Sequence, residues 1–204
     1  VWYMWIDNSY KTKAAVTEYL EAGEFISIFD NGFRTLAVIT ASSENTTWDD
    51  TKGRIERLKR LFKDETAIMP QMLNLLTDED VTATDLIHVE TKSWVKGNAV
   101  LLGDAAHGFE PYASIGGSMA LEDGYILASE LMQVSKTYSL ADALKRYEKK
   151  RKVRVNLALR LTRRMKGWLL IKSKSMRKLV DFIIPYFPAR YFMKDYHKLM
   201  KEEI

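Results

Sequence analysis

Cysteine is absent from the 204-residue sequence, and so is any run of eighteen or more uncharged apolar residues. Without cysteine the chain can form neither a disulfide framework nor a thiolate metal site. Without a long apolar run no transmembrane helix is expected, and the first residues lack the basic-then-apolar pattern of a secretion signal. We therefore expect a protein of the reducing cytoplasm.

A second absence concerns the ten glycines, none of which forms the G-x-G-x-x-G run that binds the pyrophosphate of a dinucleotide. The chain starts with Val1 and enters at once an aromatic, strand-like segment, residues 1–6. A strand with no lead-in residues is typical of a chain that continues a longer one. We therefore expect this chain to be part of a longer protein.

What the sequence does contain is a large apolar fraction and an uneven distribution of charge. Hydrophobic residues make up 47% of the chain, enough for a sizeable core in one large or two small domains. Residues 149–178 carry thirteen Lys or Arg and no acid, so the net charge of +4 hides a basic segment on an acidic body. Two interpretations stay open: a solvated helix packed on the body, or an interfacial helix attracted to anionic lipid or another acidic surface. Nucleic acid is not expected, because no base-reading module accompanies the charge.

The first half of the sequence predicts three or four antiparallel strands. Asn31-Gly32 separates two β-rich runs, 25–29 and 34–40, and this arrangement is a strong hairpin signal. Residues 1–6 and 16–20 supply the other two predicted strands. Most of the aromatic residues here are expected to belong to the sheet core.

Helices are predicted on either side of a further strand. Thr46 or Thr47 is expected to cap a helix that runs to about Lys63, and a shorter helix is expected within residues 65–76, starting or kinking at Pro70. Residues 86–90 predict a strand. Ser139-x-x-Asp142 has the form of a capping box, which predicts a long helix from Leu140 to about Ile171.

The segment from residue 98 to residue 130 carries the strongest functional signal. A buried strand is predicted over residues 99–102, followed by Gly103-Asp104, a loop of small residues, and a helix from about Ile115. Such strand-loop-helix units bind ligands at the carboxyl end of the strand. The Asp104 carboxylate can accept hydrogen bonds from hydroxyls, and Gly116-Gly117 let backbone N–H groups at the positive end of the helix approach electron-rich atoms.

Individual parts of this segment, taken alone, are weaker evidence for a ligand site. Gly103-Asp104 alone is typical of an ordinary turn, and His107 alone is more often a hydrogen-bonded loop residue than a catalyst. Asp104 and His107 together supply two ligands, which are too few for a metal site. We therefore expect no metal and assign no catalytic acid or base.

The whole segment resembles the second flavin-binding motif of the FAD-dependent aromatic hydroxylases. These are the class A flavoprotein monooxygenases of the para-hydroxybenzoate hydroxylase type, whose pattern is roughly G-D-A-A-H-x3-P-x2-G-x-G-x3-A-x-E-D. This chain matches the pattern except at Ser114, where a glycine is usual. The resemblance implies that Asp104 binds the ribityl chain of FAD and that backbone amides at the helix start contact the pyrimidine edge of the flavin. The implied cofactor-binding residues are Gly103, Asp104, Pro111, Gly116, Gly117 and Ser118.

The resemblance also implies an architecture. Trp94 and Gly97 match a run that precedes the motif in the family, and Tyr147 and Arg151 match a Tyr-x3-Arg helix that follows it. The expected fold is α+β: an antiparallel substrate-domain sheet, the returning strand and helix of an FAD-binding domain, and a helical carboxyl-terminal tail. The expected domains are 1–96, 97–136 and 137–204. The amino-terminal Rossmann part that binds the ADP half of FAD is expected to be missing.

The function implied by the resemblance is that of an FAD-dependent monooxygenase. With NAD(P)H and O2 it would act on an apolar or aromatic small molecule above the antiparallel sheet, and this chain alone would be incomplete and inactive. Two alternatives stay open. One is a prenyl-reductase-like flavoprotein that shares the Gly-Asp motif, and the other is a non-catalytic module that binds membranes peripherally through residues 149–178.

Overall fold

The computed structural model describes residues 1–7, 16–30, 32–41, 49–62 and 69–201. These residues form two compact units, one made of residues 1–85 and 169–179 and the other of residues 86–168 and 180–204. The fold is the predicted α+β combination of an antiparallel sheet and several helices. The domain boundaries drawn from the sequence remain a prediction.

The first unit is built on a five-stranded antiparallel sheet with the order β2-β3-β4-β1-β5. The predicted hairpin is confirmed: Asp30 Oδ1 accepts a hydrogen bond from the Gly32 amide over 2.8 Å at the turn, and strands β3 and β4 pair on either side of it. The strands are β1 (Trp2–Asp7), β2 (Val16–Glu21), β3 (Glu24–Asp30), β4 (Arg34–Ala41) and β5 (Val81–Ala83).

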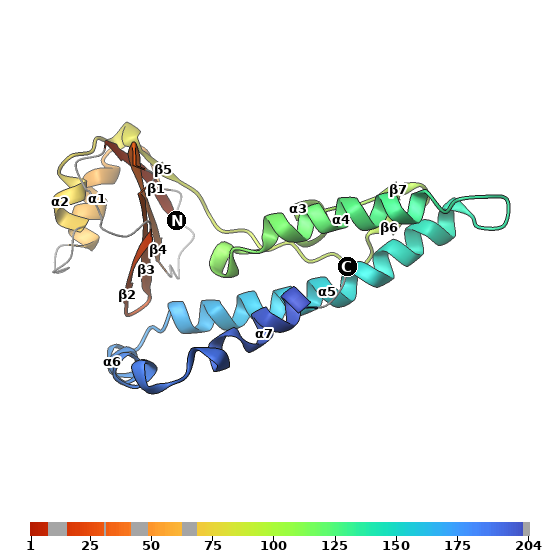
Figure 1. Cartoon of the computed structure of the whole chain (residues 1–204). Coiled ribbons are helices and arrows are strands. Elements are labelled where there is room, and N and C mark those ends of the chain that lie inside the picture. The colour runs from red at the N-terminus through yellow and green to blue at the C-terminus, as the bar shows by residue number, and fades with distance from the viewer. Residues whose placement is uncertain (8–15, 31, 42–48, 63–68, 202–204) are drawn as a thin grey trace. The chain divides into compact units, whose positions relative to one another are not determined.

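Two helices cover one face of this sheet, as Figure 1 shows on the left of the picture: α1 (Arg54–Leu61) and α2 (Met69–Leu73). Alternate residues of the strands, such as Met4, Ile28 and Ile39, meet Leu58 and Met72 of the helices in a single buried core. The opposite face of the sheet is less covered, as the 45% exposure of Trp5 shows.

The helix expected from Thr46 or Thr47 begins later than predicted. Both threonines lie outside the described residues, and residues 49–53 are not helical. Helix α1 is instead capped from a distant residue: Asp78, in the 3-10 turn η1 (Asp78–Asp80), accepts hydrogen bonds from the amides of Gly53 and Ile55 over 2.6 and 2.8 Å. A carboxylate at a helix start satisfies free N–H groups and is favoured by the helix dipole. The hydrogen bonds from Ile55 and Gly53 lower the pKa of Asp78.

The second unit is mostly helical. Helix α4 (Gly116–Leu131) and the long helix α5 (Leu140–Leu169) run side by side, and α7 (Ala189–Lys201) lies along α5 (Figure 1). The Ser139 hydroxyl donates to Asp142 over 2.7 Å and accepts from its amide over 3.2 Å, which confirms the predicted start of α5. The shorter elements are β6 (Val95–Lys96), β7 (Ala99–Val100), α3 (Asp104–His107), η2 (Pro111–Ala113), α6 (Lys174–Ile183) and η3 (Ile184–Tyr186).

Two strand predictions in this unit are wrong. Residues 86–90 form an irregular connection in which Ile87 is 72% exposed, and a single bond from the Val89 amide to the Gly108 carbonyl does not make a ladder. The predicted buried strand 99–102 is only β7, which pairs with β6 and leaves Leu101 partly exposed. Among the described residues no other strand pairs with β7, and Val100 and Leu102 pack only partly buried against the core around Trp94 and Tyr147.

Candidate flavin site

Gly103 lies between the β6–β7 hairpin and helix α3, and it packs on helix α4. Its backbone has φ 53° and ψ −136°, a combination that side chains rarely adopt. A Cβ atom at this position would lie 3.0 Å from the Cβ of Ala120, and the Gly103 amide donates to Asp123 Oδ2 over 2.8 Å. The predicted glycine is therefore required both by its conformation and by its close packing on α4.

Asp104 is the first residue of the short helix α3 and its side chain is exposed. The amides of Ala106 and His107 both donate to the Gly103 carbonyl over 2.9 Å, which fixes the turn that carries Asp104. Gly103, the residue before Asp104, packs on Ala120 in the second turn of α4. The role predicted for Asp104 stays a prediction.

The start of α4 has no side-chain cap. Its N-cap residue is Ile115, which has no polar side-chain atom, and the first hydrogen bond of the helix runs from the Met119 amide to the Ile115 carbonyl over 3.0 Å. The amides of residues 116–118 lie ahead of this bond, at the positive end of a 16-residue helix. Gly117 and Ser118 are exposed, and a Cβ atom on Gly117 would meet no other atom within 4 Å.

The loop before α4 has a serine at position 114 in a conformation that favours glycine. Ser114 has φ 52° and ψ 31°, the left-handed conformation that explains why a glycine is usual in the pattern. Its amide donates to the carbonyl of Pro111 over 3.0 Å, and Pro111 begins η2 with an exposed ring. A left-handed serine costs about 1–2 kcal/mol relative to the right-handed region, which the rest of the loop offsets.

Beneath the exposed loop lies a buried ionic cluster centred on Asp123. This carboxylate receives the Gly103 amide, His107 Nε2 over 2.6 Å and Arg151 Nε over 2.6 Å, and its side chain is fully buried. Burial raises the pKa of Asp123, but the hydrogen bonds from His107 and Arg151 outweigh it, so the pKa lies below its ordinary value. The carboxylate thus ties the motif loop, α4 and α5 together.

Arg151 uses its remaining donors on α4 as well. One terminal nitrogen lies 2.7 Å from Glu122 Oε2 and the other donates to the Met119 carbonyl over 3.1 Å. Glu122 is shared with Arg154, whose Nε and a terminal nitrogen lie 2.5 and 2.9 Å from its two oxygens. Burial raises the pKa of Glu122, and the hydrogen bonds from Arg154 and Arg151 bring it below its ordinary value.

Aromatic side chains pack around the His107 end of the ionic cluster. The His107 ring is 1% exposed and lies between Trp94 and Phe109, with centroid separations of 5.1 Å to each. The Tyr147 hydroxyl donates to the Leu101 carbonyl over 3.1 Å, and burial raises the pKa of Tyr147. His107 is thus enclosed beneath the loop and bonded to Asp123, which is the structural role favoured in the sequence.

The basic residues of α5 meet further acids along α4. Glu130 is fully buried, with Lys150 Nζ at 2.6 Å, Arg146 Nε at 3.3 Å and the Tyr138 hydroxyl at 3.0 Å. Asp123 and Glu130 occupy the same buried stripe of α4 as Met119 and Ile126. Three residues of the basic segment, Lys150, Arg151 and Arg154, are therefore paired with acids of α4.

The structure divides the predicted motif into two sets. The exposed set contains Asp104, Pro111, Gly117 and Ser118, and Gly116 is partly exposed. Gly103 is buried and packs on α4. The second set is the buried ionic cluster, to which the sequence reasoning gave no role. Its signal was present, because the acids at positions 123 and 130 are seven residues apart and lie three or four residues from Met119 and Ile126 on the apolar stripe of α4.

The exposed set fits a ligand with hydroxyl groups at one end and electron-rich atoms at the other. The Asp104 carboxylate accepts hydrogen bonds, and the open surface at Gly117 leaves the helix-start amides accessible to a flat ring. Fold and site together define a flavin-binding domain. The FAD binding domain family model matches residues 14–162, and the chain belongs to this family. The match confirms FAD as the cofactor and the aromatic hydroxylases as the group of relatives.

Named relatives agree with this assignment. The chain is 33% identical over 158 residues to zeaxanthin epoxidase of Prunus armeniaca, covering 70% of this chain and 24% of the relative. It is 39% identical over 119 residues to aurachin C monooxygenase/isomerase of Stigmatella aurantiaca, covering 57% of this chain and 30% of the relative. The chain therefore spans less than a third of either relative.

Solved structures show the same fold. HpxO of Klebsiella pneumoniae, in complex with FAD and uric acid, matches with a TM-score of 0.78 at 19% identity, over 98% of this chain and 52% of that chain. The tetracycline destructase Tet(55) matches with a TM-score of 0.71 at 20% identity, over 100% of this chain and 54% of that chain. At these identities the likeness establishes the fold.

Proposed function

We propose that the protein carrying this chain is an FAD-dependent monooxygenase that uses NAD(P)H and O2 on an apolar or aromatic small molecule. The proposal is supported by the family and by relatives named as an epoxidase and a monooxygenase. The observation that carries it is that Gly103, next to the exposed Asp104, donates to the buried Asp123 of α4, a helix whose start has no side-chain cap.

The residues of this chain hold the cofactor in the proposed function. Asp104 accepts hydrogen bonds from hydroxyls of the ribityl chain, and the amides of residues 116–118 stabilise negative charge at the pyrimidine edge. FAD, when bound, supplies the redox chemistry by which oxygen is activated. The protein contributes position and electrostatics, and its helix dipole favours the anionic form of the flavin.

The buried ionic cluster makes this site rigid. A functional residue must be held within a fraction of an ångström, and it is held best by neighbours that are themselves fixed. Gly103 is fixed by Asp123, Asp123 by Arg151 and His107, and Arg151 by the backbone of α4. The turn that presents Asp104 therefore moves with the helix whose amides complete the site.

The substrate surface in this proposal is the antiparallel sheet of the first unit. In the family such a sheet forms the floor of the substrate pocket, and here its less covered face carries Trp5, with the guanidinium of Arg34 5.4 Å from the ring centroid. An aromatic, partly exposed sheet face suits an apolar or aromatic substrate. The prenyl-reductase-like alternative shares the flavin site and differs in the reaction.

The test uses the full-length protein that carries this chain, purified with FAD. Reduced NAD(P) is oxidised under air in the presence of candidate apolar aromatics and isoprenoids, and products are analysed by mass. A product heavier by one oxygen atom, labelled from 18O2, supports the proposal. A product that gains two hydrogens without O2 supports the reductase, and a full-length protein that binds no flavin contradicts both.

A further inference from the structure

Helix α6 and the turn η3 present an apolar face to solvent. Phe182 is 70% exposed and Tyr186 is 77% exposed, values unusual for aromatic side chains in a folded protein. Met176, Leu179 and Ile183 follow at spacings of three and four residues, so they share one side of the helix. We call the α6–η3 surface the set Lys174, Met176, Lys178, Leu179, Phe182, Ile183, Tyr186 and Phe187.

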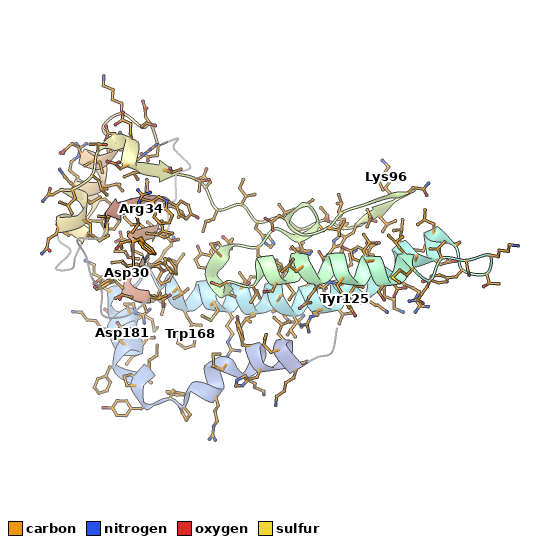
Figure 2. All side chains as sticks on the ribbon, turned by 45° about the horizontal axis from the view of Figure 1, so that its top comes forward. Asp30, Arg34, Lys96, Tyr125, Trp168 and Asp181 are labelled. Carbon is orange, nitrogen blue, oxygen red and sulfur yellow. The ribbon has the colours of Figure 1, made fainter. Side chains whose placement is uncertain are left out.

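This face is not part of any core formed by the described residues. The three hydrophobic clusters of the described chain contain no residue of the α6–η3 surface. The neighbouring amphipathic helix α7 behaves differently, because its Tyr196 and Leu199 pack with Leu161 and Met165 of α5. Figure 2 shows aromatic side chains that project outward from the segment near Asp181.

The charge on this segment has the sign that complements an anionic surface. Residues 172–188 carry four basic residues and a single acid, Asp181. Lys174 and Lys178 are exposed and lie beside the apolar face by helical spacing. Along α5, in contrast, basic residues meet acids: Arg163 lies 2.8 Å from Glu90 and Lys166 2.6 Å from Glu110.

We propose that the α6–η3 surface docks on an anionic phospholipid bilayer, with its aromatic side chains in the headgroup region and its lysines at the phosphates. Basic amphipathic helices with exposed aromatic residues bind in this way, and each lysine adds attraction to an anionic leaflet. A second copy of the chain is the less suitable occupant, because two faces of the same positive sign would meet. The contact is peripheral, since no described helix is long and apolar enough to cross a membrane.

This inference goes beyond the flavin chemistry and places the protein where apolar substrates dissolve. It also refines the basic segment 149–178, because the α5 part of that segment is occupied by internal ion pairs. The docking surface instead begins at Lys174 and extends past residue 178 to Phe187, into the aromatic stretch that follows the basic run.

The experiment is sedimentation of the full-length holoprotein with vesicles of phosphatidylcholine, with or without phosphatidylglycerol. We expect binding to the anionic vesicles that weakens as salt is raised. Phe182→Ser with Tyr186→Ser should weaken binding about tenfold or more, because two apolar side chains no longer enter the bilayer. Lys174→Gln with Lys178→Gln should weaken it about fivefold for each charge removed.

Matched controls change equally exposed residues elsewhere. Phe33 and Met132 are 85% and 87% exposed, and Phe33→Ser with Met132→Ser should bind vesicles like the wild type. Lys96→Gln with Lys136→Gln removes the same charge from other exposed positions and should also leave binding unchanged. Flavin content and melting temperature verify that each variant is folded.

Three results would overturn the proposal. The first is a wild type that does not sediment with anionic vesicles, or that binds neutral vesicles equally well. The second is that the α6–η3 variants bind no more weakly than their controls. The third is a change in oligomeric state, measured by light scattering, in the Phe182→Ser/Tyr186→Ser protein with vesicle binding unchanged, which would make this face an interface between copies.

Discussion

Arg151 Nε lies 2.6 Å from Asp123 Oδ1, and the two side chains are 2% and 0% exposed. This buried ion pair joins α5 to α4 across 28 positions of sequence, and through Asp123 it reaches the Gly103 amide at the base of the flavin loop. The buried charged residues Asp123 and Arg151 therefore hold in place the loop that carries the proposed ligand-binding atoms.

Removal of the arginine should destabilise the fold strongly. Arg151→Met removes one of the three donors to the buried Asp123 carboxylate and the side-chain donor to the Met119 carbonyl, and we expect a loss of about 3–5 kcal/mol in the free energy of unfolding. Urea denaturation measures it. Arg160→Met, at an exposed position of the same helix, should change stability by no more than about 0.5 kcal/mol. Equal effects of the two substitutions would contradict the role given to the pair.

Asp123 should make stability depend on acidity in a defined direction. Because its pKa in the folded protein lies below the ordinary value of 3.8, the folded state releases this proton more easily than the unfolded state. The resulting stability is complete above the unfolded-state pKa and is lost as the pH falls through the folded-state pKa. We expect the free energy of unfolding to drop from about pH 5 downward.

The substitution Asp123→Asn should flatten this acid slope while it lowers stability at neutral pH. Unfolding curves at several pH values between neutral and strongly acidic measure both effects. Asp85→Asn, at an exposed position, serves as the control and should keep the slope of the wild type. A wild-type slope in the Asp123→Asn protein would show that the group does not carry the effect.

Gly103 should tolerate no side chain because of both its φ and Ala120. Gly97 provides the comparison, since it has φ 59° but a Cβ atom added there would meet nothing within 4 Å. Gly97→Ala should cost about 1–2 kcal/mol of backbone strain. Gly103→Ala should cost more, because its φ 53°, ψ −136° conformation is close to a region that only glycine adopts, and because the contact with Ala120 adds roughly 1–3 kcal/mol. Urea denaturation of the two variants measures the difference. Ala120→Gly in the Gly103→Ala background should recover part of it, and if it recovers none, the close packing on α4 is not the cause.

Local signals in the sequence predicted much of this fold. The Asn31-Gly32 turn identified the hairpin, and Ser139 with Asp142 identified the start of α5, because each signal acts on residues a few positions away. The strand expected at 86–90 failed because alternation of side chains does not supply a pairing partner. The prediction of a buried strand over residues 99–102 was wrong for a related reason. An apolar run indicates that a strand would be buried within a sheet, but it does not show whether neighbouring strands are present.

The ligand-facing part of the site stays a prediction from the motif, and the buried cluster was not predicted. Gly103, Asp104 and Gly116 lie in one continuous motif, so a pattern of about twenty residues was enough to find them. The buried ionic cluster joins Asp123 to Arg151, a pairing that the sequence does not display. The basic residues of α5 were interpreted as a solvated or lipid-facing surface because their acidic partners are on another helix.

The central claim is that the Asp104 carboxylate and the start of α4 hold the flavin, and the most direct test is the FAD dissociation constant of the full-length Asp104→Ala protein. The account predicts that binding weakens by about 1–3 kcal/mol, the worth of one or two hydrogen bonds to a charged group, with the melting temperature of the apoprotein unchanged. Asp85→Ala, an exposed carboxylate elsewhere, should bind FAD like the wild type. An Asp104→Ala protein with unaltered FAD affinity would contradict the account.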